Sequence, residues 1–203
     1  MYSFIKPVFF ALDPERAHDL ALANLAFISK QRFLTAKLER FYNNCVPELP
    51  VNCMGLDFKH PIGLAAGLDK DARAFSAFGA LGFSAVEMGT VTPLPQPGND
   101  KPRMFRLVED HAIINRMGFN SGGVDNFLDN LKGNTECQAI AGINIGKNAS
   151  TSIEEAHFDY VSALQRVYSA ADYVTVNISS PNTKSLRDLQ NENFLDHLLS
   201  QIK

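Results

Sequence analysis

The sequence contains few cysteines, and their spacing shows no sign of a metal site or a disulfide framework. The 203 residues include Cys45, Cys53 and Cys137, with no CxxC pair and no paired histidine ligands. Metal sites and disulfide scaffolds require closely spaced ligands or an even set of cysteines. We therefore expect reduced thiols, as in cytosolic proteins, and no bound metal.

The chain also lacks a strong charge bias and a long apolar run. Its formal net charge of −3 does not favour a nucleic-acid partner. The early apolar run PVFFAL is stopped by Asp13, far short of the roughly 20 residues that span a bilayer. Lys6 and Pro7 interrupt the same region and no small-residue cleavage site follows. We therefore expect neither a transmembrane helix nor a signal peptide.

Several common catalytic and nucleotide-binding motifs are missing. The sequence has no GxGxxG, HExxH or GxSxG pattern. The stretch GINIGKNAS resembles a phosphate loop, but only three residues separate Gly142 from Gly146, and Asn148 follows Lys147. The Walker pattern needs four residues between the glycines and a hydroxyl residue after the lysine, so this stretch is not a phosphate loop of that kind.

Residues 1–44 differ from the rest of an otherwise ordinary globular composition. They carry six Lys and Arg against four Asp and Glu, a balance of +2, whereas the remainder stands at −5. Asp13 followed by Pro14 predicts a helix start, and the apolar spacing over 34–42 predicts a second helix. Two short amphipathic helices fit a membrane surface. They also fit a helical hairpin that packs on its own domain. Residues 45–50 are expected to form a linker.

From residue 51 onward, strand and helix patterns alternate. Residues 51–61 predict a small hairpin, and a long excursion separates the second strand from residue 121. The expected strands are 62–67, 83–89, 138–146 and 173–179, and the expected helices are 71–81, 122–132, 153–170 and 191–203. Four strand–helix units in succession predict a parallel sheet covered by helices.

Polar residues follow the ends of these strands, most visibly in the stretch VTVNISSPNT (174–183). Gly67 with Lys70, then Thr90, Asn144 and Asn177, occupy equivalent positions. Strands of one parallel sheet point the same way, and ligands bind beyond their carboxyl ends. We therefore expect these groups to converge on one ligand site. Taken singly, Gly67 is equally explained by a turn, and Thr90 or Asn144 by a helix cap.

Five longer stretches carry a family resemblance: GLAAGLDKD, GTVTPLPQPGNDKPRMFRL, INRMGFNS, GINIGKN and VNISSPNT. Together they resemble the membrane-associated, class 2 dihydroorotate dehydrogenases. This resemblance implies an α/β fold, a (β/α)8 TIM barrel, of which residues 45–203 supply about the first four units after the helical segment 1–44. It also implies FMN as cofactor, oxidation of dihydroorotate to orotate in pyrimidine synthesis, and a membrane quinone as electron acceptor.

The resemblance also implies roles for individual residues. Ser180 matches the catalytic base, and a cysteine there would instead be typical of the soluble class. His18 and Arg106 would line the quinone path, with the N-terminal helices resting peripherally on the cytoplasmic face of the cell membrane. The FMN contacts would be Ala66, Gly67, Leu68, Asp69, Lys70, Thr90, Asn144 and Asn177. The substrate contacts would be Lys70, Asn115, Arg116, Met117, Gly118, Phe119, Asn177 and Asn182.

These residue types suit the implied chemistry. Asparagine offers donors and acceptors, so Asn115, Asn177 and Asn182 can read a flat ring with alternating N–H and C=O groups. Lys70 offers a compact positive charge for the substrate carboxylate and for charge developing on the flavin. A complete barrel has eight strands, so a second flavin lysine and the glycine loops for the FMN phosphate are expected outside this segment.

Two other interpretations remain open at this level. One is a non-catalytic fragment that binds flavin weakly, or that persists only by pairing with another chain or a membrane. The other is a TIM-barrel enzyme of phosphosugar metabolism, which Lys70 and the loop of Ser180 and Asn182 disfavour. A flavin spectrum in the purified protein would separate the leading interpretation from the first alternative.

Overall fold

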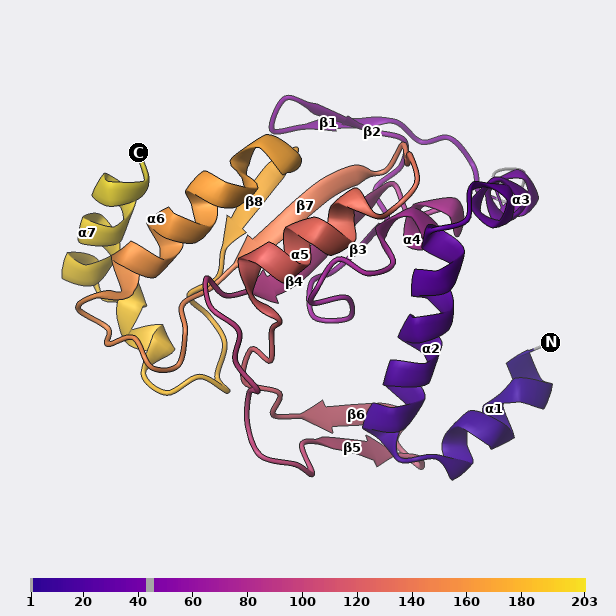
Figure 1. Cartoon of the computed structure of the whole chain (residues 1–203), viewed down its shortest axis with the longest axis horizontal. Coiled ribbons are helices and arrows are strands. Elements are labelled where there is room, and N and C mark those ends of the chain that lie inside the picture. The colour runs from indigo at the N-terminus through magenta and orange to yellow at the C-terminus, as the bar shows by residue number, and fades with distance from the viewer. Residues whose placement is uncertain (1, 43–45) are drawn as a thin grey trace.

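The computed structural model describes residues 2–42 and 46–203, and a four-stranded parallel sheet forms its centre (Figure 1). The strands are hydrogen-bonded in the order β3-β4-β7-β8, which is also their order along the chain. Their bounds are β3 (Gly63–Leu64), β4 (Ala85–Val91), β7 (Ile140–Ile145) and β8 (Tyr173–Val176). Parallel neighbours joined in sequence by helices are the arrangement of the first half of a (β/α)8 barrel.

Helices follow the strands in turn, and α5 and α6 lie over one face of the sheet (Figure 1). Met88 of β4 and Ile143 of β7 are fully buried in one core with Phe127 of α5 and Tyr160 of α6. Successive strand residues point to opposite faces, so Glu87 and Asn144 point away from this core. The helices are α4 (Phe75–Ala80), α5 (Gly123–Lys132), α6 (Ala156–Val167) and α7 (Glu192–Ile202), with 3-10 turns η1 (Tyr168–Ala170) and η2 (Leu186–Gln190).

The predicted units are confirmed, but several boundaries are wrong. The strands predicted at 62–67 and 173–179 end earlier, at Leu64 and Val176. The helix α4 starts at Phe75 instead of residue 71. The carboxylate of Asp69 accepts hydrogen bonds from the backbone N–H groups of Arg73 (2.9 Å) and Ala74 (2.7 Å). A side chain that holds these N–H groups in a turn competes with helix formation, so the helix begins after it.

The N-terminal segment contains three helices, where the sequence predicts two. They are α1 (Tyr2–Ala11), α2 (Pro14–Ser29) and α3 (Arg32–Tyr42). Asp13 caps α2 as expected, since its Oδ1 accepts from the N–H groups of Glu15 (3.0 Å) and Arg16 (3.1 Å). The helix α1 was missed because Pro7 lies inside it and proline removes a backbone donor.

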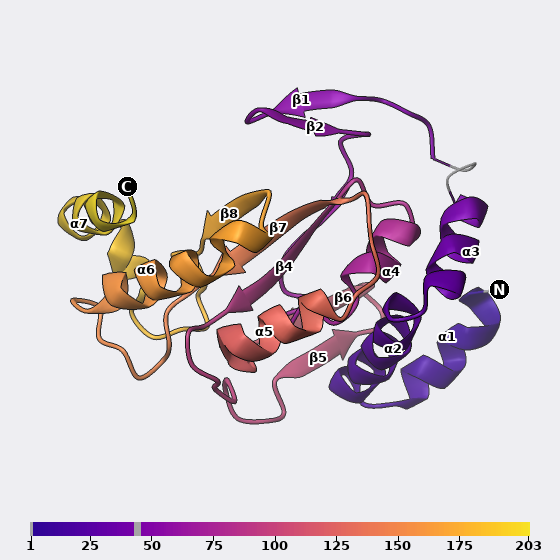
Figure 2. The ribbon, with the colours of Figure 1, turned by 45° about the horizontal axis from the view of Figure 1, so that its top comes forward.

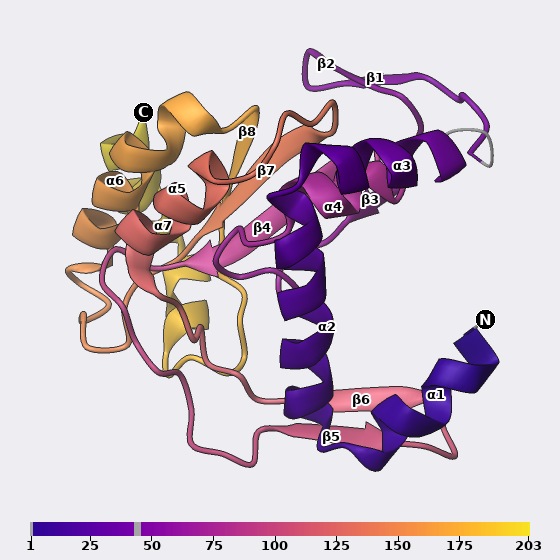
Figure 3. The same ribbon diagram turned by 45° about the vertical axis from the view of Figure 1, so that its right-hand side comes forward.

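Two antiparallel hairpins flank the sheet. The predicted hairpin, β1 (Val51–Cys53) with β2 (Leu56–Phe58), stands away from the rest of the molecule (Figure 2). The second, β5 (Met104–Leu107) with β6 (Ala112–Asn115), lies beside α1 and one end of α2 (Figure 3). The sequence predicts only an irregular excursion there.

The described residues can be compared with the expectations about cysteines, metal sites and membrane-spanning helices. Cys53 is exposed and Cys137 partly buried, both as free thiols, while Cys45 lies outside the described residues, as does the start of the predicted linker. Within 2–42 and 46–203, no cluster of three or more His, Cys, Asp and Glu side chains is arranged to hold a metal ion. No helix of these ranges combines the length and apolar character needed to cross a bilayer.

Candidate active site

Three polar side chains meet at the carboxyl ends of neighbouring strands. Thr90 Oγ1 donates to Asn144 Oδ1 (2.5 Å), and Asn177 Nδ2 donates both to Thr90 Oγ1 (3.0 Å) and to Asn144 Oδ1 (3.1 Å). They come from the ends of β4 and β7 and from the residue after β8. The expected convergence of Thr90, Asn144 and Asn177 is confirmed, and we call these three residues the amide row.

The carboxylate of Glu87, in the strand β4, orients the amide row. Glu87 Oε1 accepts from Asn144 Nδ2 (2.8 Å), and Glu87 Oε2 accepts from the Tyr173 hydroxyl (3.0 Å). Glu87 can only accept when ionised, so Asn144 must turn its NH2 to Glu87 and its oxygen to Thr90 and Asn177. Burial, followed by the charge of Glu87, raises the pKa of Tyr173, which therefore stays a neutral donor.

Close packing fixes the rotamer of Thr90. A Cβ at Gly146 would lie 2.6 Å from the Thr90 methyl carbon and 2.9 Å from the Phe119 ring. Contacts this close are not tolerated by a side chain, so Gly146 makes room for both groups. The methyl of Thr90 is held on that side, and its hydroxyl is left to face Asn144.

The loop after β3 brings open backbone next to the amide row. Gly67 N–H donates to the carbonyl of Gly89 (2.7 Å), one residue before Thr90. Gly67 has a φ of +108°, and a Cβ there would meet no atom within 4 Å. Ala66 is partly buried, and Leu68 is exposed. The small residues 66 and 67 therefore leave free space above the strand end.

Asp69 differs from its neighbours, because its carboxylate faces the start of α4 and not this space. The side chain is 1% exposed and holds the backbone N–H groups of residues 73 and 74. Burial raises the pKa of Asp69, and those two hydrogen bonds partly oppose the effect. Any contact between Asp69 and a ligand would have to use its backbone.

Lys70 lies at the edge of the same loop and donates to the Gly67 carbonyl (2.6 Å). Burial, and next the charge of Arg103, lower the pKa of Lys70. His18 of α2 is close enough to be affected in turn: burial, and then the charge of Lys70, lower its pKa. Lys70 therefore places a partly desolvated cation between the strand ends and α2.

Ser180 lies in the loop after β8, where its Oγ accepts a hydrogen bond from the backbone N–H of Asn182 (3.3 Å). Such a turn holds the hydroxyl oxygen in a defined direction. Asn182 Nδ2 in turn donates to the carbonyl of Asn115 (3.5 Å), at the end of β6. The structure thus brings the Ser180 loop to the predicted substrate run 115–119.

That run divides into an exposed and a buried part. Asn115 and Arg116 are exposed, and Met117, Gly118 and Phe119 are buried. Arg116 donates from Nη2 to the Pro102 carbonyl (2.9 Å), and Phe119 belongs to the hydrophobic core. The side chains of Met117 and Phe119 therefore serve packing, and Asn115 is the member best placed to reach a ligand.

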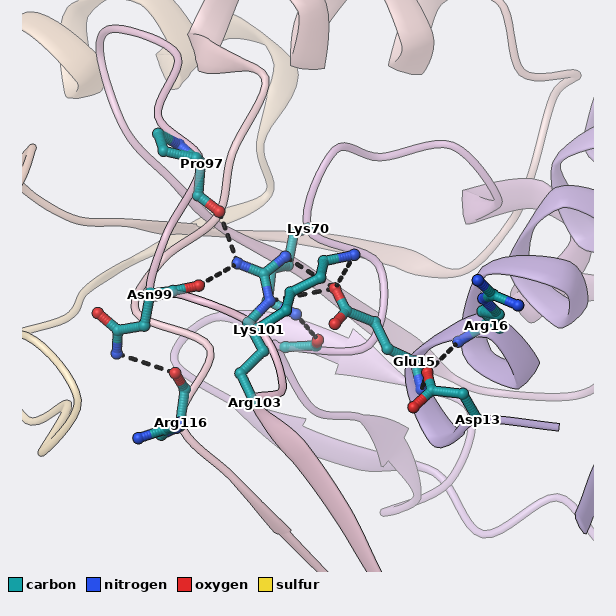
Figure 4. Close-up of polar contacts among 10 residues, drawn as sticks. Asp13, Glu15, Arg16, Lys70, Pro97, Asn99, Lys101, Arg103 and Arg116 are labelled. Atoms are coloured by element: carbon teal, nitrogen blue, oxygen red, sulfur yellow. Dashed lines mark hydrogen bonds and ion pairs between the residues drawn. The ribbon is translucent and has the colours of Figure 1, made fainter.

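A buried ion pair ties α2 to the loop before β5. Arg103 Nε (3.1 Å) and Nη2 (2.8 Å) both donate to Glu15 Oε1, and Arg103 Nη1 donates to the carbonyls of Pro97 (2.6 Å) and Asn99 (3.0 Å) (Figure 4). Glu15 and Arg103 are each 7% exposed. Burial alone would raise the pKa of Glu15, but the hydrogen bonds and charges of Arg103 and Lys101 outweigh it and lower the pKa.

Comparison with known proteins identifies the family of this chain. The family model described as Dihydroorotate dehydrogenase matches residues 48–203. The chain belongs to the dihydroorotate dehydrogenase family. A relative from Vibrio parahaemolyticus, named dihydroorotate dehydrogenase (quinone), is 53% identical over the whole chain, and one of the same name from Escherichia coli O1:K1 is 51% identical over 202 residues.

Solved dihydroorotate dehydrogenases support the same assignment. The matches also show which share of the relatives' length this chain covers. A structure of the Eimeria tenella enzyme in complex with ferulenol superposes with a TM-score of 0.78 at 41% identity, covering 94% of this chain and 50% of that one. The chain covers 59% of the length of the Vibrio parahaemolyticus relative and 58% of the Escherichia coli one.

His18 of α2 and Arg106 of β5 both lie close to the N-terminal helices. Arg106 Nη1 donates to the carbonyls of Phe10 (3.3 Å) and Leu12 (3.4 Å), and its guanidinium lies 4.4 Å from the centre of the Phe10 ring. Arg106 therefore holds the end of α1 against β5. His18 is partly buried on α2. Their role on a quinone path stays a prediction.

Sequence reasoning missed four residues that shape this candidate site: Glu15, Glu87, Arg103 and Tyr173. A signal existed for Glu87, because a carboxylate within the strand AVEMG needs a partner when buried. No local signal existed for Glu15 and Arg103, since they are 88 residues apart.

Proposed function

We propose that this chain forms the substrate-facing part of an FMN-dependent enzyme that oxidises dihydroorotate to orotate and passes the electrons to a membrane quinone, in de novo pyrimidine synthesis. The observation that carries the proposal is the amide row, with the loop of Ser180 on one side and Lys70 on the other. The family membership and the names of the relatives support the same activity.

The residues at the strand ends fit the ring of FMN. Thr90, Asn144 and Asn177 offer hydroxyl and amide groups beside the open backbone of Gly67, which suits a flat heterocycle with donors and acceptors along its edge. Ala66, Gly67 and Leu68 would border it, Asp69 would contribute only through its backbone, and Lys70 would place its cation at the rim. A bound FMN would supply a hydride acceptor for the substrate and a route for the electrons to the quinone.

The chain's own groups supply substrate binding and proton removal. Asn115, Asn177 and Asn182 present amides to the substrate ring, and Lys70 offsets its carboxylate. Ser180 Oγ would take the proton from the carbon next to the one that loses the hydride, while its own hydroxyl proton passes to solvent, to which Ser180 is partly exposed. A serine hydroxyl is a weak base when free, and the Asn182 N–H that donates to Ser180 Oγ would help by stabilising the oxygen when its own proton leaves.

We further propose that residues 1–44 form a membrane and quinone segment, residues 45–203 the first half of the barrel, and that the protein rests on the cytoplasmic face of the membrane. Large apolar side chains on α1 are unusually exposed, with Phe4 at 85% and Val8 at 63%. Exposed apolar groups of this kind mark membrane or protein contacts. Because Arg106 and His18 lie at the same helices, a quinone entering there would meet both.

We predict that the double substitution Phe4→Ser and Val8→Ser weakens binding to anionic lipid vesicles by about tenfold or more, since each buried apolar side chain contributes about 1.5–3 kcal/mol. Vesicle co-sedimentation at fixed salt measures the loss. Phe158→Ser is the matched control, because Phe158 is 64% exposed on α6, away from the N-terminal helices. Equal binding of the double variant and the wild type would remove α1 from the membrane contact.

Deletion of the whole segment is a less specific test. Leu22 and Ala26 of α2 are buried, and Glu15 pairs with Arg103, so a chain without residues 1–44 would lose stability as well as quinone access.

The alternative of a non-catalytic fragment is tested by the colour and mass of the protein. We predict that protein expressed from its complete gene carries flavin, with absorbance bands between roughly 350 and 500 nm that bleach when dihydroorotate is added without oxygen. Intact-mass measurement on the same sample identifies the chain that holds the cofactor. Colourless protein that gains no flavin on addition of FMN would favour the non-catalytic fragment.

A further inference from the structure

Asn99 connects two parts of the candidate substrate wall. It lies in the loop between β4 and β5, and its single NH2 group donates to the carbonyl of Arg116 (2.9 Å) and to the carbonyl of Asn182 (3.2 Å). Arg116 belongs to the run after β6, and Asn182 to the loop that carries Ser180. One amide thus bridges segments that are 66 residues apart in the sequence.

The direct hydrogen bond from the loop of Ser180 to the run 115–119 is long. Asn182 Nδ2 lies 3.5 Å from the Asn115 carbonyl, at the outer limit for a hydrogen bond. Asn99 therefore makes the shorter link, and it does so with geometry that only a two-donor group can provide. An aspartate would present oxygen lone pairs to both carbonyls, and an alanine would present nothing.

Two backbone hydrogen bonds and close packing against Gly118 hold Asn99 in place. Its backbone N–H donates to the Met117 carbonyl (3.0 Å), and its carbonyl accepts from Arg103 Nη1 (3.0 Å). A Cβ at Gly118 would lie 2.6 Å from Asn99 Cγ, so the amide fits only because residue 118 is a glycine. Arg103, which donates to the Asn99 carbonyl, also pairs with Glu15 and thereby connects Asn99 to α2 (Figure 4).

We propose that Asn99 is a positioning residue that sets where the Ser180 loop stands against residues 115–119, and that it is braced from α2 by the pair of Glu15 and Arg103. The inference rests on the proposed function for the identity of the substrate. The quantity that Asn99 controls is the distance between the loop of Ser180 and Asn115. Without the amide this loop moves relative to Asn115, and the substrate ring is bound less well.

The test compares Asn99→Ala and Asn99→Asp with the wild type, as flavin-loaded protein expressed from the complete gene. A misplacement of about 1 Å in a substrate-holding group costs on the order of 100-fold in rate. We expect orotate affinity to fall by about tenfold and flavin reduction by dihydroorotate by about 10- to 100-fold. Hydrogen exchange should quicken in peptides covering 178–185, which reports the loop without any turnover.

Two further measurements separate positioning from a general loss of structure. In Asn99→Asp, lowering the pH toward the carboxyl pKa of about 3.9 restores one O–H donor, so orotate affinity relative to the wild type should partly recover. If Asn99 acts through Ser180, the double variant with Ser180→Ala should be no slower than Ser180→Ala alone, because the two changes are coupled.

The matched control is Asn52→Ala, which also removes an amide that makes a hydrogen bond, to Asp57 in the β1–β2 hairpin (2.8 Å). It should change neither orotate affinity nor loop exchange. Additive effects in the double variant, or unchanged exchange in both Asn99 variants, would overturn the inference. If dihydroorotate does not reduce the flavin of the wild type, the proposed function fails instead, and exchange of the loop still reports on Asn99.

Discussion

Replacing Ser180 with alanine is expected to slow flavin reduction by dihydroorotate by about 10²–10⁴-fold, the range that a positioned general base contributes. The flavin should remain bound, because the amide row and Gly67 do not depend on the Ser180 hydroxyl. Rapid mixing of oxidised enzyme with dihydroorotate, without oxygen, measures the rate through the loss of flavin absorbance.

Two companion variants sharpen this experiment. Ser180→Cys should retain part of the rate and show a rise with pH through about 8.5, where a free thiol ionises. Ser200→Ala removes a hydroxyl from α7 that donates to the His197 carbonyl, and it should leave the rate unchanged. A Ser180→Ala enzyme as fast as the wild type would exclude Ser180 as the base.

Breaking the pair of Glu15 and Arg103 is expected to lower the free energy of unfolding by about 3–5 kcal/mol, because removal of one partner leaves the other charge buried and unpaired. Glu15→Gln tests this, since it keeps the size of the side chain and leaves Arg103 at 7% exposure without a counter-charge. Denaturant titration of the flavin-loaded protein, followed by circular dichroism, measures the difference.

The surface member of the same cluster supplies the control. Lys101 Nζ also contacts Glu15 Oε1 (3.1 Å), but its side chain is 64% exposed, so Lys101→Met should cost less than about 1 kcal/mol. Equal losses for Glu15→Gln and Lys101→Met would show that burial adds nothing to this ion pair.

The effect of Glu15→Gln should depend on pH in a defined direction. The pKa of Glu15 is lowered from its ordinary value of 4.5, so the unfolded chain binds this proton more readily than the folded protein. The stabilisation by the carboxylate is then fully present above about 4.5 and is lost as the pH falls through the lower folded pKa. The difference between wild type and variant should shrink correspondingly below pH 4.5.

Much of the fold and part of the site could be predicted because their signals are local. Strand periodicity located β4 and β7, Asp13 and Pro14 located the start of α2, and the polar residues after each strand located Thr90, Asn144 and Asn177. The motif around Ser180 is contiguous, so family resemblance could identify it without coordinates.

Errors arose where a hydrogen bond to a charged side chain overrides a local helix preference. The helix α1 forms around Pro7, with the carbonyls near its end bound by Arg106 from β5. The start of α4 is delayed because the Asp69 carboxylate takes the N–H groups of residues 73 and 74. In each case the deciding hydrogen bond is a property of the folded chain, and helix propensity is only a weak guide.

The sequence by itself determined the order of the strand–helix units, the polar character of the strand ends and the family, because periodicity, capping and contiguous motifs act over a few residues. Only the tertiary structure decided that Glu87 orients Asn144, that Glu15 neutralises Arg103, and that Asn99 joins Arg116 to Asn182. These pairings depend on which loops meet after the sheet assembles. Buried polar groups need hydrogen-bond partners in the folded protein. When the partner is far away in the sequence, the residues around each group do not indicate the pairing.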